Sequence, residues 1–328
     1  MRQAIISSFP SVKILDLYEP SNVEDENVFE IKIGVAVAVL STAREFAGVD
    51  YQKLSGKVLA KSAALLENKI EFFKISPRSP NYFLKKRQEI GAATYEAYFS
   101  IDDIYPVGTT GVITAWDDVA IGFNYADLKR SLEDLYKNHS RLKATQSERF
   151  SNIKKIVAVG ELDQIICPVT YRPFDNRAIA KHDAFVWRMK NEVSKHLNGS
   201  QNLSLISARS NKNENMDHFF VTREISEAKT GESSTQSKFF PIWLKGNLDR
   251  QSNLSRSFLV AFQSALGLEP NDYLPEDLTA ELHTEKIFHY IYAVLHSPNY
   301  RKRYAAFLRT DFPRIPIPGD RKLFNALS

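Results

Sequence analysis

Cysteine is almost absent: Cys167 stands alone among 328 residues. An internal disulfide is therefore excluded, and a reducing compartment such as the cytoplasm is expected. Its neighbours Ile165, Ile166 and Val169 predict a buried, inert thiol. The longest strongly apolar run, near residues 33–40, is far shorter than the roughly 20 residues that span a bilayer. The N-terminus also lacks the apolar core of a secretion signal. We therefore expect no membrane partner.

The usual motifs of catalysis are missing as well. The sequence contains no GxxxxGK[ST] phosphate loop, no HExxH zinc motif and no GxSxG nucleophile elbow. Its seven histidines show no metal-ligand spacing with the one cysteine. The acidic pairs Asp102-Asp103 and Asp117-Asp118 are interpreted as loop or cap residues, because adjacent side chains point in different directions. We expect no catalytic, cofactor or metal site that this chain completes alone.

What is present is typical of a globular protein of about two domains, with 43% hydrophobic and 25% charged residues. The net charge of +4 permits a nucleic-acid partner without demanding one. The charge lies in blocks. Residues 100–135 hold seven acids against two bases, whereas 141–160 hold five bases against one acid and 299–328 hold seven bases against two acids. Solvated helix faces are the alternative explanation for each block.

The N-terminal part predicts strands at 12–17, 28–40 and 69–75 and a helix at 58–66. Residues 28–40 are apolar or small on both faces, which favours a central, covered strand. Pro77 and Pro80 interrupt the pattern. We place a domain boundary there, between residues 1–76 and 77–328.

Beyond this boundary strands and helices are interspersed without a regular βα rhythm, which predicts an α+β fold. The last sixty residues are helical, with Ser297 and Pro298 starting the final long helix. The composition of residues 226–238 predicts a mobile surface loop. The other strand candidates are 111–115, 119–123, 165–172, 203–209, 218–225 and 239–245, and the other helix candidates are 126–137, 146–157, 184–197 and 254–266.

Two segments resemble a known family. YRPFDNR occurs at 171–177, and FHYIYAVLHSPNYRKRYAAFLRTDFPRIPIP occurs at 288–318. Both are similar to the C-terminal specificity region of Type ISP restriction–modification enzymes. Weaker similarity occurs at 111–118 (GVITAWDD) and 239–244 (FFPIWL). DENVFEIKIGVAV at 25–37 resembles the stretch that follows the catalytic motif of these N6-adenine DNA methyltransferases.

The resemblance implies a remnant of a Rossmann-like methyltransferase sheet at 1–76. It implies a mixed α/β target-recognition domain at 77–328, with a helical C-terminal part. The methyl-donor loop and the Asn-Pro-Pro-Tyr/Phe tetrapeptide of the family are missing, and SPNY at 79–82 stands in the wrong place and order. We therefore expect a fragment that is inactive alone. S-adenosylmethionine is implied for the full-length enzyme and no cofactor for this chain.

A target-recognition role implies double-stranded DNA as partner, which requires Lys and Arg for phosphates and a few bidentate readers of base edges. Arg172 and Arg177 flank a turn, and a salt bridge with Asp175 that braces it is an equal alternative. Arg188, Lys190 and Lys195 share a predicted helix with Trp187. The tyrosines at 290, 292, 300 and 304 are expected in the core. The DNA-binding candidates are Lys85, Lys86, Arg87, Arg172, Arg177, Arg188, Lys190, Lys195, Arg301 and Lys302.

Two other hypotheses remain open at this point. The chain could be the partner-dependent half of a split DNA methyltransferase. It could instead be a protein–protein module for a helicase or nuclease subunit. In each case the upstream methyltransferase, helicase and nuclease portions are expected partners if they are encoded separately.

Overall fold

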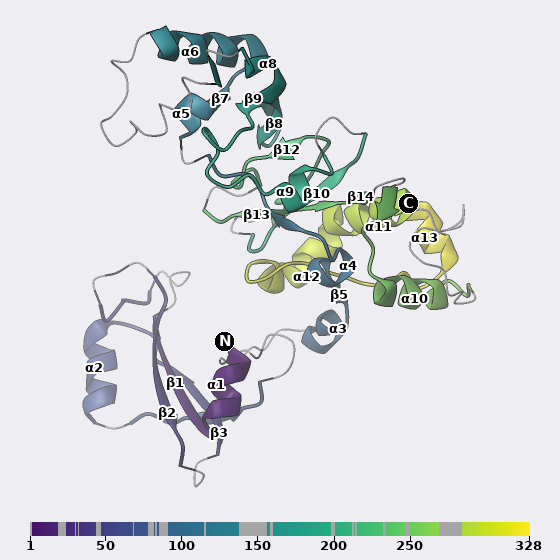
Figure 1. Ribbon diagram of the computed structural model, residues 1–328. Helices are drawn as coiled ribbons and strands as arrows, with labels where there is room; N and C mark the ends of the chain where they lie inside the picture. The colour runs from purple at the N-terminus through teal and green to yellow at the C-terminus, as the bar shows by residue number, and fades with distance from the viewer. Residues whose placement is uncertain are drawn as a thin grey trace. The chain divides into compact units, whose positions relative to one another are not determined.

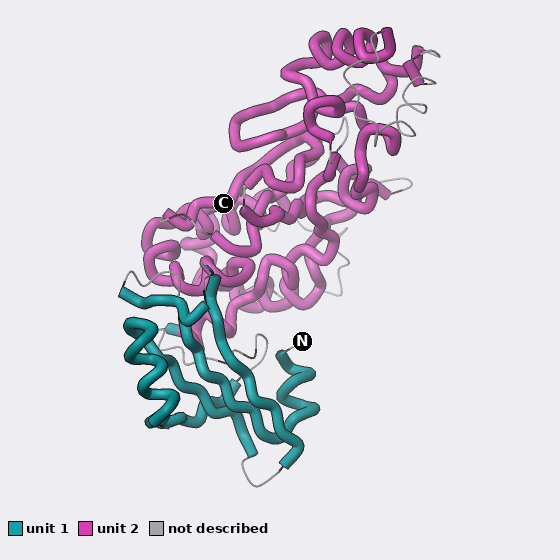
Figure 2. The backbone as a smooth tube through the Cα atoms, turned by 90° about the vertical axis from the view of Figure 1, so that its left-hand side faces the viewer, with its two compact units in different colours: residues 1–91 teal, residues 92–328 magenta. Residues whose placement is uncertain are grey.

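A computed structural model shows two compact units, residues 1–91 and 92–328 (Figure 2). The candidates Lys85, Lys86 and Arg87 lie outside the described residues, as does most of the predicted helix at 146–157. The structure describes residues 2–18, 24–29, 31, 33–43, 47–67, 69–77, 82, 84, 91–114, 116–137, 156–157, 160–197, 201–211, 213, 215–231, 234–246, 250–268 and 284–328.

The first unit is a mixed four-stranded sheet in the order β2-β1-β3-β4 (Figure 1). Strand β1 pairs antiparallel with β2 and parallel with β3, and β4 pairs antiparallel with β3. Its core is small, and Val12, Ile14, Val49 and Tyr51 form its centre. The elements are α1 (Arg2–Ser8), β1 (Ser11–Tyr18), β2 (Val35–Ser41), β3 (Gly48–Lys53), α2 (Val58–Leu66) and β4 (Phe73–Ile75).

The position of strand β2 contradicts one prediction from the sequence. The two-faced apolar pattern of 28–40 predicts a central, covered strand, but β2 lies at an edge of this sheet. Val37 is 45% exposed and Val39 is 58% exposed. The alternation of apolar residues predicts that a segment is a strand, but strand order depends on pairing with distant segments. The central positions belong instead to β1, which corresponds to the predicted strand at 12–17, and to β3, a strand that the sequence pattern did not predict. The Rossmann-like origin of this sheet stays a prediction.

The second unit contains two four-stranded sheets. One has the order β11-β10-β13-β6 and is antiparallel throughout, and the other has the order β12-β8-β9-β7, in which only β12 and β8 are parallel. Strands β14 with β15 and β16 with β5 form short pairs. The strands are β5 (Phe99–Ser100), β6 (Thr109–Thr110), β7 (Ile121–Gly122), β8 (Ile166–Arg172), β9 (Asp175–Ala180), β10 (Ser204–Ala208), β11 (Phe219–Thr222), β12 (Ile225–Ser226), β13 (Ser237–Pro241), β14 (Trp243–Lys245), β15 (Arg250–Ser252) and β16 (Arg314–Ile315).

Helices cover these sheets and form the C-terminal part of the unit (Figure 1). Two hydrophobic cores result. One joins α10, α11, α12 and α13 through residues such as Phe262, Tyr290 and Phe324, and the other packs α6 against β8 and β9. The helices are α3 (Ala92–Glu96), α4 (Ile101–Ile104), α5 (Asp117–Ala120), α6 (Tyr125–Lys137), α8 (Leu162–Ile165), α9 (Asn191–Ser194), α10 (Arg256–Ala265), α11 (Thr284–His296), α12 (Pro298–Leu308) and α13 (Arg321–Leu327). The fold is α+β, as predicted.

The long C-terminal segment at 288–318 folds as its local signals predict. Ser297 is the N-cap of α12 and accepts a hydrogen bond from the Tyr300 N–H at 3.4 Å, with Pro298 in the first turn. Tyr290 and Tyr300 are buried and donate to the carbonyls of Pro316 and Arg314 at 3.0 and 2.8 Å. A core role for these tyrosines is confirmed. Among the described helices, none is long and apolar enough to cross a membrane.

Candidate nucleic-acid interface

The YRPFDNR segment forms the tip of the β8–β9 hairpin. Arg172 faces Asp175 across the strand pair, so that Pro173 and Phe174 make a two-residue turn. The register slips between Thr170 and Arg172, which places a bulge at the end of β8. Phe174 adopts a left-handed φ of 62° and its side chain is 98% exposed. The hairpin therefore presents an aromatic ring at its end.

Arg177 braces this turn. Its Nε donates to both carboxylate oxygens of Asp175 at 3.0 Å, and its Nη2 donates to Oδ2 at 2.8 Å. These hydrogen bonds raise the pKa of Arg177. Asp175 and Arg177 are two residues apart on one strand, so their side chains leave the same face of the sheet. The bracing salt bridge thus forms with Arg177, and a DNA contact by this side chain stays a prediction.

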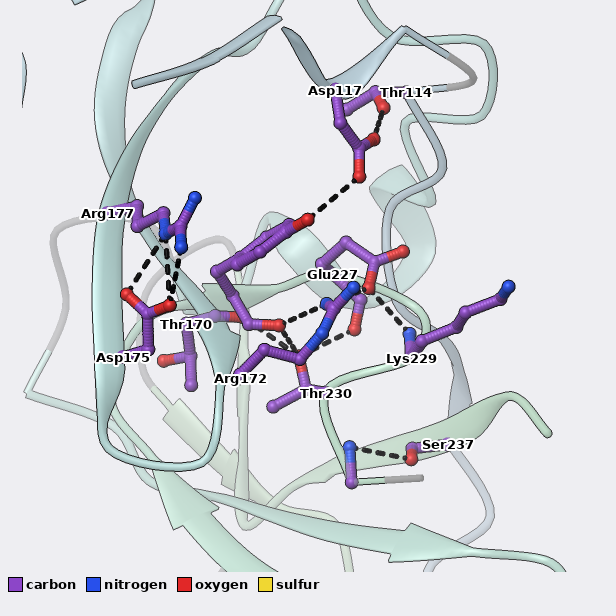
Figure 3. A network of polar contacts seen from close by, with 12 residues as sticks. Thr114, Asp117, Thr170, Arg172, Asp175, Arg177, Glu227, Lys229, Thr230 and Ser237 are labelled. Atoms are coloured by element: carbon purple, nitrogen blue, oxygen red, sulfur yellow. Dashed lines mark hydrogen bonds and ion pairs between the residues drawn. The ribbon is translucent and has the colours of Figure 1, made fainter. Parts of the chain in front are cut away.

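Arg172 reaches a different acid. Its Nη1 lies 2.6 Å from Glu227 Oε2 and also donates to the Tyr171 carbonyl at 2.6 Å. The Glu227 side chain is only 9% exposed, and its Oε2 accepts a further hydrogen bond from the Lys229 N–H at 2.8 Å. Burial raises the pKa of Glu227, against the opposing effects of the Lys229 N–H and of Arg172. The ion pair therefore ties the hairpin to the segment after β12 (Figure 3).

Aromatic rings and guanidinium groups stack along the hairpin. Two guanidinium groups lie against the Tyr171 ring, with Cζ of Arg172 at 3.9 Å and Cζ of Arg177 at 4.2 Å from its centroid. The Arg177 group also lies 4.7 Å from the ring of Phe123, which is 74% exposed. Such contacts stabilise by about 0.5–1 kcal/mol each at exposed sites. We call Phe123, Arg177, Tyr171 and Arg172 the stacked ladder.

The segment 111–118 supports the stacked ladder from beside it. The Tyr171 hydroxyl donates to Asp117 Oδ2 at 3.2 Å, and Asp117 also accepts a hydrogen bond from Thr114 (Figure 3). Two motifs that are 54 residues apart in the sequence thus meet at one hydroxyl. The similarity of residues 111–118 to the family is weak, and the contact of Asp117 with Tyr171 places this segment in support of the YRPFDNR hairpin.

The predicted surface loop at 226–238 is wrong for residues 226–231, which are largely buried, whereas Ser234 and Gln236 are exposed. Ala228 and Thr230 are 2% and 1% exposed, and only Lys229 among the six is exposed. The Thr230 hydroxyl donates to the carbonyls of Thr170 and Glu227 at 2.8 and 2.7 Å. The polar side chains of this segment satisfy buried backbone groups, which composition alone cannot distinguish from solvation.

A close backbone contact holds this segment next to Val112. The Val112 N–H donates to the Ser226 carbonyl at 2.8 Å, and the Ala228 N–H donates to the Val112 carbonyl at 3.0 Å. A Cβ on Gly111 would lie 2.4 Å from the Ser226 carbonyl oxygen. Glycine at position 111 is therefore required by the approach of two backbones.

The predicted helix at 184–197 is largely wrong. The N–H groups of Trp187 and Arg188 both donate to the Ile113 carbonyl, at 2.8 and 3.0 Å, and the Ile113 N–H donates to the Arg188 carbonyl at 3.1 Å. Lys190 then adopts a left-handed φ of 51°. Only the single turn α9 is helical. Bridging to Ile113 uses the backbone groups that a helix would need, so tertiary pairing outweighs the local propensity.

The remaining candidates differ in their surroundings. Arg188 is exposed, and its Cζ lies 4.8 Å from the ring centroid of Trp187, which is 60% exposed. Lys195 is exposed, whereas the ammonium of Lys190 lies 4.0 Å from Glu192. Bridging through Ile113 brings Arg188 to the segment that carries Asp117. The structure thus joins Arg172, Arg177 and Arg188 in one region.

Arg301 and Lys302 lie elsewhere, on α12. Arg301 is partly buried and its Nη2 donates to the His296 carbonyl at 3.2 Å, which closes the end of α11. Lys302 is exposed. None of the contacts in the described part of the chain joins these two side chains to the β8–β9 hairpin, so the structure does not bring them together with Arg172 and Arg177.

Sequence reasoning missed Phe123, Glu227 and Thr230 as parts of this region. Phe123 falls outside the quoted motifs, and Glu227 and Thr230 both fall in the segment interpreted as a surface loop. No spacing rule links them to residues 171–177. Within the described residues, no group of three His, Cys, Asp or Glu side chains could hold a metal ion.

Comparison with known proteins finds a matching family and several similar structures. The family described as "Type ISP C-terminal specificity domain" matches residues 103–328. Comparison of the sequence with curated proteins finds no match. The chain is similar to the structure titled "cryoEM structure DrdV-DNA complex", with 21% identity, a TM-score of 0.63 and coverage of 99% of this chain and 35% of that one.

Two further structures are similar. A nuclease-deletion mutant of the Type ISP restriction-modification enzyme LlaGI, in complex with a DNA substrate mimic, has 18% identity, a TM-score of 0.59 and coverage of 99% and 32%. The ATP-dependent Type ISP enzyme LlaBIII bound to DNA has 15% identity, a TM-score of 0.59 and coverage of 97% and 23%. The chain spans about a third or less of the length of these proteins, and at such identities they show the shared fold. Since the family match covers more than half of the sequence, this chain belongs to the Type ISP C-terminal specificity domain family.

Proposed function

We propose that this chain is the DNA target-recognition portion of a restriction–modification N6-adenine DNA methyltransferase. The family match over residues 103–328 carries the proposal. The three similar structures, whose titles each name DNA, support it. Modifying an adenine requires that the base leave the stack while the duplex is held, and a target-recognition domain supplies the holding surface.

The charged groups of the region divide by role. Arg172 and Arg177 are engaged with Glu227 and Asp175, so their first role is to fix the hairpin. Arg188 and Lys195 are exposed, and no ion pair involves either of them in the part of the chain that the structure describes. We assign Arg188 and Lys195 to phosphate oxygens, which contact every sequence alike and set the position of the protein on the duplex.

Salt dependence tests this assignment. If about four to six phosphates are contacted, the logarithm of the association constant falls with the logarithm of salt at a slope of roughly −4 to −5. Fluorescence anisotropy with a labelled duplex over a range of about 20–200 mM salt measures the slope. The double variant R188A/K195A should flatten it by about one to two.

A matched control removes the same charge from the first unit, at the exposed Lys57 and Lys69. The variant K57A/K69A should keep the wild-type slope. A wild-type slope in R188A/K195A would remove both residues from the interface. Absence of any duplex binding by the wild-type chain would contradict the proposed function itself.

In this proposal the upstream methyltransferase portion carries out methyl transfer. The sequence lacks the donor loop and the catalytic tetrapeptide of the family, so we expect no binding of S-adenosylmethionine to this chain in calorimetry at millimolar cofactor. A micromolar dissociation constant would instead favour a chain that contributes directly to the cofactor site, as in a split methyltransferase.

A further inference from the structure

The exposed ring of Phe174 has no evident role in the fold. It lies at the end of the β8–β9 hairpin, 98% exposed, with its centroid 6.4 Å from that of Phe220 in an edge-on contact. Burial of a phenylalanine is a main source of folding free energy, and this side chain contributes almost none of it. A single exposed apolar residue is ordinary, but this one also has an unusual backbone.

The backbone at Phe174 is in the left-handed region, with φ of 62°. It follows Pro173 at the third position of a tight turn, where glycine or asparagine is favoured because a Cβ is disfavoured at positive φ. A bulky residue with this conformation is a genuine outlier. Such strain persists only where the surrounding structure imposes it, and it points to a role for the side chain.

The surroundings impose this conformation through contacts on both strands. Asp175, the residue after Phe174, receives three hydrogen bonds from Arg177. Arg172, the residue before the turn, is held at 2.6 Å by Glu227. The hydroxyl of Tyr171 is held by Asp117. The ring of Phe174 is therefore presented on a braced tip.

The chemistry around the tip suits a nucleic acid. The acids Asp175, Glu227 and Asp117 each accept hydrogen bonds from an arginine or a tyrosine, which reduces their repulsion of phosphates. The stacked ladder beside the tip combines guanidinium groups with aromatic rings, and side chains of both kinds stack on nucleic-acid bases. A two-stranded ribbon is also narrow enough to enter a DNA groove.

We propose that Phe174 is an aromatic wedge that inserts between base pairs of duplex DNA when the hairpin enters a groove. Apolar side chains used in this way unstack a base step and unwind or kink the duplex. This inference rests on the proposed function and adds a specific contact to it. The bracing contacts keep the turn that carries the ring ordered, so that little ordering of the backbone is required on binding.

The test uses the full chain, closed circular plasmid DNA and a topoisomerase. A plasmid presents many sequences, so the recognised site need not be known. Bound wild-type chain should change the linking number of the relaxed plasmid. F174A and F174N should abolish that change and weaken duplex binding in anisotropy about tenfold, the loss of one stacking contact. The slope with salt should stay at its wild-type value, because no phosphate contact is removed.

Two further variants serve as controls. F174W keeps a wedge and should retain the linking-number change. F29A removes an aromatic residue of the first unit that is 52% exposed, and should bind and unwind DNA as the wild type does. F174N should raise Tm, because asparagine tolerates the left-handed region. A loss of unwinding in this more stable variant cannot result from unfolding.

The outcomes separate this inference from the proposed function. Wild-type affinity and unwinding in F174A would overturn the wedge and leave target recognition intact. Unchanged DNA binding combined with lost association with the upstream enzyme portions would also overturn it and assign the tip to a protein contact. Absence of DNA binding by the wild-type chain would overturn both proposals.

Discussion

Replacing Arg172 with methionine would remove the cation that faces a nearly buried carboxylate. Arg172 Nη1 lies 2.6 Å from Glu227 Oε2, with the glutamate side chain 9% exposed and the arginine side chain 34% exposed. Methionine keeps the apolar stem while removing the charge and the hydrogen bonds. Glu227 would retain the hydrogen bond from the Lys229 N–H at 2.8 Å.

The expected loss in the free energy of unfolding lies between two limits. Removing one partner of a fully buried ion pair costs about 3–5 kcal/mol, whereas an exposed pair contributes about 0–1 kcal/mol. Because water reaches Arg172 but hardly reaches Glu227, we expect R172M to lower the free energy of unfolding by about 2 kcal/mol. For a unit of this size the loss corresponds to a Tm lower by roughly 4–8 °C.

The loss should depend on pH with a definite sign. Burial raises the folded-state pKa of Glu227 above 4.5, so ionisation of this group opposes folding. The penalty is absent below the unfolded pKa, where the carboxyl is protonated in both states, and grows as pH rises through the folded pKa. Removing Arg172 raises the folded pKa further. The deficit of R172M should be complete at alkaline pH and should shrink as pH falls toward 4.5.

Urea unfolding of the full chain at several pH values measures this deficit. Adding E227Q to R172M should recover most of it at alkaline pH, since no buried charge then remains. R209M is the matched control, because Arg209 pairs with Asp311 at 3.1 Å but is 68% exposed. It should cost about 0–1 kcal/mol. A deficit of R172M that is equal at acid and alkaline pH, or that E227Q does not relieve, would refute the reasoning.

Three other perturbations test the packing. G111A places a Cβ 2.4 Å from a backbone oxygen and should lower the free energy of unfolding in urea by about 3 kcal/mol. G319A, which has open space around the new Cβ, should change this free energy by less than about 0.5 kcal/mol. Equal effects of the two substitutions would contradict the close approach of the backbones at Gly111. K61M removes the cation that lies 2.6 Å from Asp25, in an ion pair with neither side chain exposed. It should lower the stability of residues 1–91 by about 3–5 kcal/mol, which faster amide hydrogen exchange in these residues would show. Unchanged exchange would argue against the ion pair. Cys167 is only partly buried, not fully as predicted, and this burial raises the pKa of its thiol to about 11. Iodoacetamide should therefore label Cys167 at pH 8 about a hundredfold more slowly in the folded chain than in urea, and similar rates would show an accessible thiolate.

Local signals in the sequence were sufficient for the elements whose stability is local. The Ser297-Pro298 start of α12 follows from N-cap chemistry, and the apolar stripe of α11 follows from helical spacing, with Ile287 and Ile291 fully buried. The hairpin turn at Pro173 likewise lies where its proline predicts it. The two family motifs also identified the family that the comparison shows over residues 103–328.

Elements that depend on distant pairing were predicted poorly. Strand β2 is apolar on both faces but lies at a sheet edge, and residues 226–231 are mostly polar but, except for Lys229, buried. Residues 187 and 188 pair with Ile113 instead of continuing a helix. In each case the local pattern agrees with more than one environment, and the partner that decides between them lies far along the chain.

The ion pairs of the hairpin show which contacts the sequence predicts and which depend on the tertiary structure. The sequence by itself indicated that Arg172 and Arg177 flank a turn and that Asp175 could brace it. Asp175 pairs with Arg177, since residues two apart on a strand share a face. Arg172 pairs instead with Glu227, 55 residues away. Only the tertiary structure decided that partner, because the parallel pairing of β12 with β8 sets Ile225 and Ser226 beside Val169 and Thr170 and so brings the next residue, Glu227, within reach of the arginine.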